Sequence, residues 1–369
     1  MASSGITVLL GAGSVLDVCP ELSTESLTNV ITSFPTKKYP SNDIVLIERY
    51  KAIELINTIN HYYDTNNKGR TFEDIFQFII DMRSEKEIDE GKSVLHYQMP
   101  DFVNDYSSND CENALCFILE KIFTNIRNTN NIDLPLWYSN FFTEISKWCR
   151  EQIHLDCYTL NYDCFIDRAL GVFNDGFIHK GYDYSVFKPK KARLSKSMTP
   201  ILNHIHGSIL FNYRPIEEES DDIIYKYDLA TASPPSPIII DTQIGKYAMF
   251  SPIITGLDKP NSIMIGPFSM YHANMIHSLA RNDVLLIIGY GFHDNYLNSL
   301  IDSYHRQKGK KTVIVTPDAN DFLSTGIIKE GIYHNHHYRR KGITVFKDSF
   351  KNACKNGLLD YVKSLLTIH

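Results

Sequence analysis

The sequence lacks most features that mark secreted, membrane-spanning or metal-stabilised proteins. Its seven cysteines are odd in number and no two lie at Cys-x-x-Cys spacing, which argues against a disulfide framework. No cysteine occurs between His206 and Cys354, so a zinc site built from thiolates cannot form there. No run approaches the roughly twenty apolar residues needed to cross a bilayer, and no secretory signal pattern opens the chain. These absences predict a cytosolic protein without disulfides or zinc.

Charge and composition narrow the class of protein further. The formal net charge of -6 argues against a large basic face for sequence-independent DNA binding. The 369 residues are 43% hydrophobic and 12% aromatic, which suffices for a large buried core, and this length allows about two domains. The composition therefore predicts an ordinary globular protein, such as an enzyme.

The first distinctive feature is a short apolar run followed by a glycine turn. Residues Ile6 to Leu10 lead directly into Gly11-Ala12-Gly13-Ser14, a pattern typical of a buried parallel strand that presents a dinucleotide phosphate. The two glycines would let the backbone turn tightly and approach a pyrophosphate, and the N–H groups of the next helical turn would supply donors. Glycine used only for steric reasons is the alternative.

Two further segments have the same character of a buried strand that ends in a turn. One runs from Cys157 to Leu160 and ends at Asn161, and the other runs from Val284 to Ile288 and ends at Gly289-Tyr290-Gly291. In an open parallel sheet, ligands bind beyond the carboxyl ends of the strands. We therefore expect all three turns to face one crevice.

The remaining chain is predicted to alternate between helical and sheet-forming parts. Residues 21–150 are predicted to be mostly helical, with two core-facing stripes and a third helix from an N-cap at Ser139 to Ile153. Short strands and loops are expected after His206, further buried strands at 311–316 and 342–346, and a closing helix over 349–366. The stripes are Phe72, Ile75, Phe76, Ile79 and Ile80, and Leu115, Ile118, Leu119, Ile122 and Ile126.

Taken in order, the motifs resemble a sirtuin-type (Sir2-type) NAD-binding domain, and more closely the bacterial sirtuin-like NADases of antiphage defence than the protein deacylases. The likeness extends from Gly11 to about Thr316. The strings that carry it are Gly11-Ala12-Gly13, Thr159 to Asp163, Ile205-His206-Gly207, and Ile288 to Asp294 with Asn298. The chain departs from the family in two ways. Sirtuins usually place the loop serine two positions after the second glycine, whereas here Ser14 follows Gly13 directly. Protein-deacylating sirtuins carry a zinc ribbon of paired Cys-x-x-Cys motifs, and this sequence has no such pair.

The resemblance implies an α/β fold and a division of the chain. A Rossmann-like parallel sheet with helices on both faces is expected, plus a helical subdomain inserted after the first strand. Residues 1–20 and 151–369 would form the NAD-binding domain, and 21–150 the mostly helical insertion. Because the zinc ribbon is absent, deacylation by the usual architecture is not expected.

The resemblance also assigns candidate roles within the site. His206 would accept a proton from water or a ribose hydroxyl, because a neutral imidazole is available near neutral pH. Asn161 would hold a water or a ribose hydroxyl, and Asp163 would meet the nicotinamide amide or order the ribose. The predicted catalytic residues are His206, Asn161 and Asp163, with no metal ligands. The predicted NAD-binding residues are Gly11, Ala12, Gly13, Ser14, Asn161, Asp163, Gly289, Tyr290 and Thr316.

Each role has a structural alternative. His206 could be a buried histidine bonded to a backbone carbonyl, Asn161 a turn residue, and Asp163 the N-cap of a helix that starts near Cys164. His204 lies at strand spacing from His206 and could share its face. For Asp294 the alternative to ligand binding is also a helix cap.

The function implied is NAD+ hydrolysis that releases nicotinamide and ADP-ribose, as a toxic effector that depletes NAD in antiphage defence. A zinc-free deacylase or ADP-ribosyltransferase, and a non-catalytic sensor of an NAD derivative, are the alternatives. We expect a homo-oligomer with a separately encoded partner, a hexameric HerA-family ATPase or alternatively an Argonaute-type protein. Loop clusters at His334–Lys341 and Lys188–Arg193 are interpreted as solvated turns or partner contacts rather than metal sites.

Overall fold

The structure is a computed structural model of the 369-residue chain. It describes residues 4–33, 44–66, 70–87, 100–129, 131–180, 183–192, 199–213, 224–234, 238–240, 248–250, 253–254, 266–305, 307, 309–317 and 342–366. The loop cluster predicted at His334–Lys341 lies outside these residues. Within them, no helix is both long enough and apolar enough to cross a membrane.

A six-stranded parallel sheet forms the centre of the fold. Its spatial order is β12-β11-β10-β1-β2-β5, so three strands extend to one side of β1 and two to the other. This is the Rossmann arrangement. Its strands are all parallel, and the order in which they are added to the sheet reverses between the first strand and the fourth. The strands are β1 (Gly5–Leu10), β2 (His154–Thr159), β5 (Ile201–His204), β10 (Val284–Ile288), β11 (Lys311–Val315) and β12 (Ile343–Phe346).

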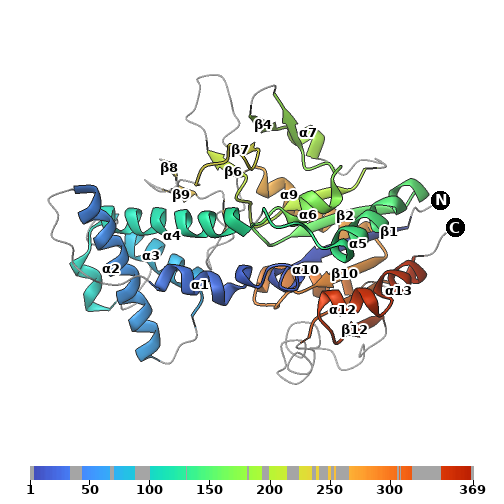
Figure 1. The fold of residues 1–369 in the computed structure, drawn as a ribbon, viewed down its shortest axis with the longest axis horizontal. Coiled ribbons are helices and arrows are strands. Elements are labelled where there is room, and N and C mark those ends of the chain that lie inside the picture. The colour runs from blue at the N-terminus through green and yellow to red at the C-terminus, as the bar shows by residue number, and fades with distance from the viewer. Residues whose placement is uncertain are drawn as a thin grey trace.

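The central strands are apolar on both faces because helices cover both sides of the sheet. Alternate residues of β2 face different helices, and Tyr158 reaches α9, where its hydroxyl lies 2.7 Å from Ser278 Oγ. On the other side, Phe350 of α12 packs edge-on against Trp137 of α5. The predicted α/β fold with a doubly covered parallel sheet is therefore confirmed (Figure 1). These helices are α5 (Leu136–Lys147), α6 (Phe165–Leu170), α9 (Phe268–Arg281), α10 (Asn295–His305), α12 (Phe350–Lys355) and α13 (Leu358–Leu365).

Helices occupy the long stretch between β1 and β2, and Figure 1 shows α1 to α4 extending away from the sheet. They are α1 (Thr24–Thr32), α2 (Ile44–Thr65), α3 (Phe72–Glu87) and α4 (Ser108–Thr129), with short 3-10 turns η1 (Ala12–Ser14), η2 (Pro20–Leu22), η3 (Asp101–Asp105) and η4 (Trp148–Glu151). Both predicted stripes are buried except Ile80, which is half-buried, and they join the same core as the sheet. The assignment of 21–150 as a subdomain stays a prediction.

Two of the predicted helices differ from those in the structure. The third helix begins at Leu136, directly after Pro135, rather than at an N-cap Ser139, because proline's fixed φ suits the start of a helix. It ends at Lys147 and continues as the η4 turn instead of reaching Ile153. The closing helix is two helices, broken where Gly357 takes a φ of 84°.

Smaller sheets follow the first half of the Rossmann sheet, as the short strands and loops predicted after His206 suggest. An antiparallel sheet has the order β3-β4-β7-β6, and β8 pairs with β9. The elements are β3 (Phe177–His179), β4 (Tyr184–Phe187), β6 (Phe211–Tyr213), β7 (Ile224–Tyr227), β8 (Ile238–Ile240), β9 (Ala248–Phe250) and the short helix α7 (Pro189–Ala192). Part of the basic stretch predicted as a loop therefore forms a short helix, α7.

Candidate functional site

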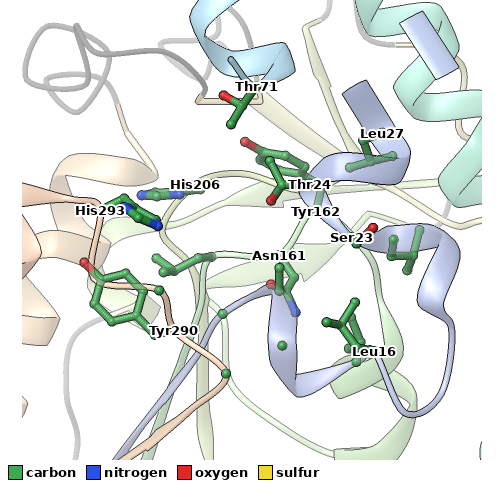
Figure 2. A pocket seen from close by; sticks show the side chains of 18 of the residues that line it. Leu16, Ser23, Thr24, Leu27, Thr71, Asn161, Tyr162, His206, Tyr290 and His293 are labelled. Carbon is green, nitrogen blue, oxygen red and sulfur yellow. The ribbon is translucent and has the colours of Figure 1, made fainter. Parts of the chain in front are cut away.

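A pocket of about 820 Å³ lies at the carboxyl ends of β1, β2, β5, β10 and β11. This is the edge of the sheet at which Rossmann proteins bind ligands. The helical segment closes the other wall with residues of α1, α3 and α4, and Figure 2 shows side chains from both walls. All but one of the predicted site residues line this pocket: Gly11, Ala12, Gly13, Asn161, Asp163, His206, Gly289, Tyr290 and Thr316.

The glycine turns after β1 and β10 pack directly against each other. The Gly11 N–H donates to Ile288 O at 3.0 Å, and the Gly13 N–H donates to Gly289 O at 2.9 Å. A Cβ on Gly289, whose φ is 62°, would lie 2.2 Å from the carbonyl carbon of Gly13. Close backbone packing thus explains why no side chain fits here.

The chain after the first glycine forms a helical turn but does not begin an α-helix there. The chain after Gly11 makes only the three-residue turn η1, and the next α-helix starts at Thr24. The N–H groups of Gly11, Gly13 and Ser14 already bond to backbone carbonyls. These three N–H groups are therefore engaged within the protein in this conformation, and phosphate binding by the helical turn stays a prediction.

Ser14 is the one predicted binding residue that does not line the pocket. The η1 turn directs it inward, where it is fully buried, and its Oγ accepts a hydrogen bond from Asn161 Nδ2 at 3.2 Å. The Asn161 N–H donates to Thr159 Oγ1 at 3.1 Å. Asn161 is thus fixed from both its backbone and its amide, and Ser14 supports it from behind.

Asp163 lies at the pocket and also caps the following helix. It lines the pocket, and its Oδ1 accepts a hydrogen bond of 3.0 Å from the Phe165 N–H at the start of α6. Its side chain is almost fully buried, and this burial raises the pKa of the carboxyl to about 6, against the weaker effect of the hydrogen bond. Such a carboxyl gains or loses its proton close to neutral pH.

His206 pairs with Asp294, which approaches from the loop between β10 and α10. His206 Nε2 lies 3.3 Å from Asp294 Oδ2, and both side chains are less than a tenth exposed. The other oxygen, Oδ1, accepts a 3.1 Å hydrogen bond from the Leu297 N–H and so caps α10. The cap expected for Asp294 is present, and the same carboxylate also holds the imidazole of His206.

His204 and His206 do not share a face. Strand β5 ends at His204, and the chain turns through the next two residues. His204 Nε2 lies 2.8 Å from Asp167 Oδ2, outside the residues that line the pocket. Of the two histidines, His206 is the one exposed to a ligand in the pocket.

Behind His204 lies a buried group of charges that joins the large and small sheets. Lys226 of β7 contacts Asp167 at 3.2 Å and Asp175 at 2.7 Å. Burial opposes ionisation of Asp167, but His204 and Lys226 outweigh it and hold the pKa of that carboxyl well below its usual range. The two carboxylates likewise overcome burial and raise the pKa of Lys226.

Tyr290 and Thr316 shape the end of the pocket formed by β10 and β11. The Tyr290 hydroxyl lies 3.1 Å from Asp294 O and 3.0 Å from Asn298 Oδ1, so it ties the loop to the first turn of α10. Burial raises the pKa of this hydroxyl, which stays protonated. Thr316 follows β11 and is 6% exposed.

The pocket is acidic at the end near His206. Asp163, Asp294, Glu73 and Asp74 all line it, and Lys and Arg do not occur among its described lining residues. Such a concentration of negative charge favours a ligand that carries or develops positive charge. Among described residues, no group of three or more His, Cys, Asp or Glu is arranged to hold a metal ion.

The sequence reasoning missed the contribution of the helical segment. Figure 2 shows Thr71 and Thr24 facing the pocket alongside Tyr162, and Glu73 lines the same wall. The spacing Thr71-x-x-Asp74 is a capping-box pattern that could have located the start of α3. No sequence signal places Glu73 at the pocket, because this depends on how α3 packs.

The chain has similarity to Sir2 homologues and to the SIR2-like domain. The chain matches none of the curated proteins with which it was compared. It is similar to a solved Sir2 homologue mutant in complex with 2′-O-acetyl ADP ribose, at 12% identity over 99% of this chain and 94% of that one, with a TM-score of 0.40. It is also similar to a solved Sir2 homologue in complex with NAD, at 12% identity over 99% of this chain and 91% of that one, with a TM-score of 0.40. Residues 156–335, which carry Asn161, Asp163, His206 and Asp294, match a family model described as the SIR2-like domain.

Proposed function

We propose that this protein hydrolyses the bond between nicotinamide and ribose in NAD+. The observation that carries the proposal is the buried His206–Asp294 pair, 3.3 Å apart, in a pocket that Asn161 and Asp163 also line. The similarity of this segment to the SIR2-like domain supports NAD as the ligand. The Rossmann topology and the two glycine turns are consistent with a dinucleotide.

The chemistry requires a base rather than an acid. The bond between ribose C1′ and the pyridinium nitrogen breaks with both electrons on nitrogen, so nicotinamide leaves as a neutral molecule. A water oxygen bonds to C1′ and loses a proton, which gives ADP-ribose, nicotinamide and H⁺ in total. His206 accepts this proton, and the Asp294 carboxylate stabilises the imidazolium that results.

The surrounding groups would stabilise the transition state. Positive charge builds on the ribose carbon as the bond breaks, and the carboxylates of Asp163 and Asp294 lie at this end of the pocket. The Asn161 amide is held by Ser14, so its carbonyl oxygen would hold the water or a ribose hydroxyl. Each group therefore has a task that its fixed position suits.

The proposal extends to a biological role. We propose that the protein is a toxic effector that depletes NAD in antiphage defence, acting as a homo-oligomer with a separately encoded HerA-family ATPase, or alternatively an Argonaute-type protein. The order of the four motifs supports this role. Light scattering of the purified chain, alone and with each candidate, should detect assemblies; monomers throughout would contradict it.

The test is NAD consumption with detection of nicotinamide and ADP-ribose. We expect His206→Ala and Asn161→Ala each to reduce turnover by at least about a hundredfold, because general base catalysis contributes about 10²–10⁴-fold. His277→Ala, on the exposed side of α9, serves as the matched control. Full turnover by both site variants would refute the proposal. Nicotinamide release only with an acyl-lysine or protein acceptor would replace it with a transferase, and NAD binding without turnover with a sensor.

A further inference from the structure

The helical segment places a carboxylate at the pocket through the first turn of α3. Thr71 and Asp74 cap this helix reciprocally: the Thr71 N–H donates to Asp74 Oδ2 at 2.7 Å, and the Asp74 N–H donates to Thr71 Oγ1 at 3.4 Å. The Phe72 N–H donates to Thr28 Oγ1 at 2.9 Å, which ties this turn to α1. Glu73 lies between these fixed residues and lines the pocket. Its position is therefore set by two helices.

Glu73 reaches the loop that carries the candidate site residues. The Tyr162 hydroxyl lies 3.2 Å from Glu73 Oε1 and 3.3 Å from Ile254 O. The tyrosine is 7% exposed, and its ring packs edge-on against Phe72. Because Tyr162 stands between Asn161 and Asp163 in the chain, this contact connects α3 to both of them.

The same tyrosine leads to the backbone of His206. The Ile254 N–H donates to His206 O at 2.8 Å, and the neighbouring Ile253 forms a bridge with Gly207. The phenol hydroxyl has one proton and faces two acceptors, Glu73 Oε1 and Ile254 O, so it shares that proton between them. A continuous set of contacts thus runs from Glu73 through the Tyr162 hydroxyl and the Ile254 peptide to His206. Figure 2 shows Tyr162 and His206 facing the same pocket.

We propose that Glu73 is a positioning residue, which holds the Asn161–Asp163 loop and the His206 backbone in the geometry for catalysis through Tyr162 and Ile254. This inference rests on the proposed NAD hydrolysis. A hydrogen bond to a carboxylate is stronger than one to a neutral acceptor, so Glu73 is well suited to fix a phenol hydroxyl. The inserted helices then form part of the catalytic apparatus, although no reacting group lies on them.

The kinetic consequence is specific. A positioning residue affects the geometry of the reacting groups more than substrate affinity, because small displacements cost rate steeply. The turns at Gly11–Gly13 and Gly289 do not belong to this path, so NAD binding should persist. We expect Glu73→Ala and Tyr162→Phe each to lower kcat about tenfold, equivalent to about 1.4 kcal/mol, with KM changed less than about twofold.

Four further variants make the test discriminating. Glu73→Gln keeps an oxygen that accepts the phenol proton and should retain most of the activity. The double variant Glu73→Ala/Tyr162→Phe should be no slower than either single variant, because both break one path. Glu112→Gln and Tyr106→Phe are matched controls: Glu112 accepts from Arg83 and Tyr106 contacts Thr58, both outside the pocket, and both should be neutral.

A second measurement does not depend on turnover. Amide hydrogen exchange at Ile254 reports directly on its bond to His206 O, and we expect it to quicken about tenfold in Tyr162→Phe but not in the controls. In Glu73→Ala it should quicken by a smaller factor, because the Tyr162 hydroxyl can then donate its proton to Ile254 O alone. Unchanged exchange together with unchanged kcat would overturn the proposal, as would a raised KM at constant kcat. If the wild-type chain consumes no NAD, the hydrolase proposal fails, and exchange alone decides whether the path exists.

Discussion

Replacement of Asp163 by asparagine should separate its catalytic role from its structural one. Asparagine keeps an oxygen that can accept from the Phe165 N–H, so the start of α6 stays capped. What it removes is a buried charge. Burial raises the pKa of Asp163 from 3.8 to about 6, so above pH 6 the folded chain must hold a carboxylate that the unfolded chain would hold at lower cost.

The size and pH dependence of the effect follow from that shift. Because each tenfold change in the dissociation constant corresponds to about 1.36 kcal/mol, ionised Asp163 costs the folded state about 3 kcal/mol at pH 7. Between about pH 4 and pH 6 the folded chain binds more protons than the unfolded chain, so this cost grows as pH rises and is constant above the window. Asp163→Asn should therefore raise the free energy of unfolding by about 2–3 kcal/mol at pH 7, and by roughly half as much at pH 5.

Urea unfolding of both proteins at pH 5, 6, 7 and 8 measures this difference. The exposed Asp133→Asn variant is the control and should show no pH-dependent gain. Under the proposed function, the stabilised Asp163→Asn variant should also lose NAD turnover. A stability difference that is constant with pH, or that grows as pH falls, would refute the reasoning.

Three further predictions concern other parts of the site and its support. Asp294→Asn should lower kcat about a hundredfold, because asparagine does not stabilise the imidazolium. The free energy of unfolding should stay within about 0.5 kcal/mol of the wild-type value, because asparagine still caps α10. NAD turnover and urea unfolding measure the two quantities, and a loss of stability large enough to account for the loss of turnover would contradict the prediction. Gly289→Ala should abolish soluble folded protein or cost more than about 2 kcal/mol, whereas Gly357→Ala, with positive φ but open space, should cost about 1 kcal/mol; equal thermal shifts would count against this. Lys226→Met should cost about 3–5 kcal/mol in urea unfolding because it leaves buried Asp167 without its cation, and a neutral result would exclude this stabilising role.

Much of the architecture could be predicted because it follows from local pattern. Apolar runs that end in glycine or asparagine identified β1, β2 and β10, and the parallel topology brings their carboxyl ends together. Asn161, Asp163 and His206 therefore line one pocket although they are far from Gly11 in the sequence.

The details that were missed depend on tertiary packing. The contact of Asp294 with His206 is set by the loop after β10, and the approach of Glu73 is set by the packing of α3 on α1; neither leaves a periodic signal. The length of the helical turn after Gly11 also depends on packing: the chain makes only a three-residue 3-10 turn there. The break at Gly357 did have a signal, since a glycine after asparagine is typical of a helix end.

The strand order has a consequence for synthesis of the chain. Strand β1 emerges first, yet its two neighbours in the sheet begin at His154 and Val284. A nascent chain that has not reached β10 already contains Asn161 and His206, but it lacks the glycine turn and Asp294 that complete the pocket. The central strand gains its second partner only from the last quarter of the chain, so a translation product that ends before β10 cannot form this site.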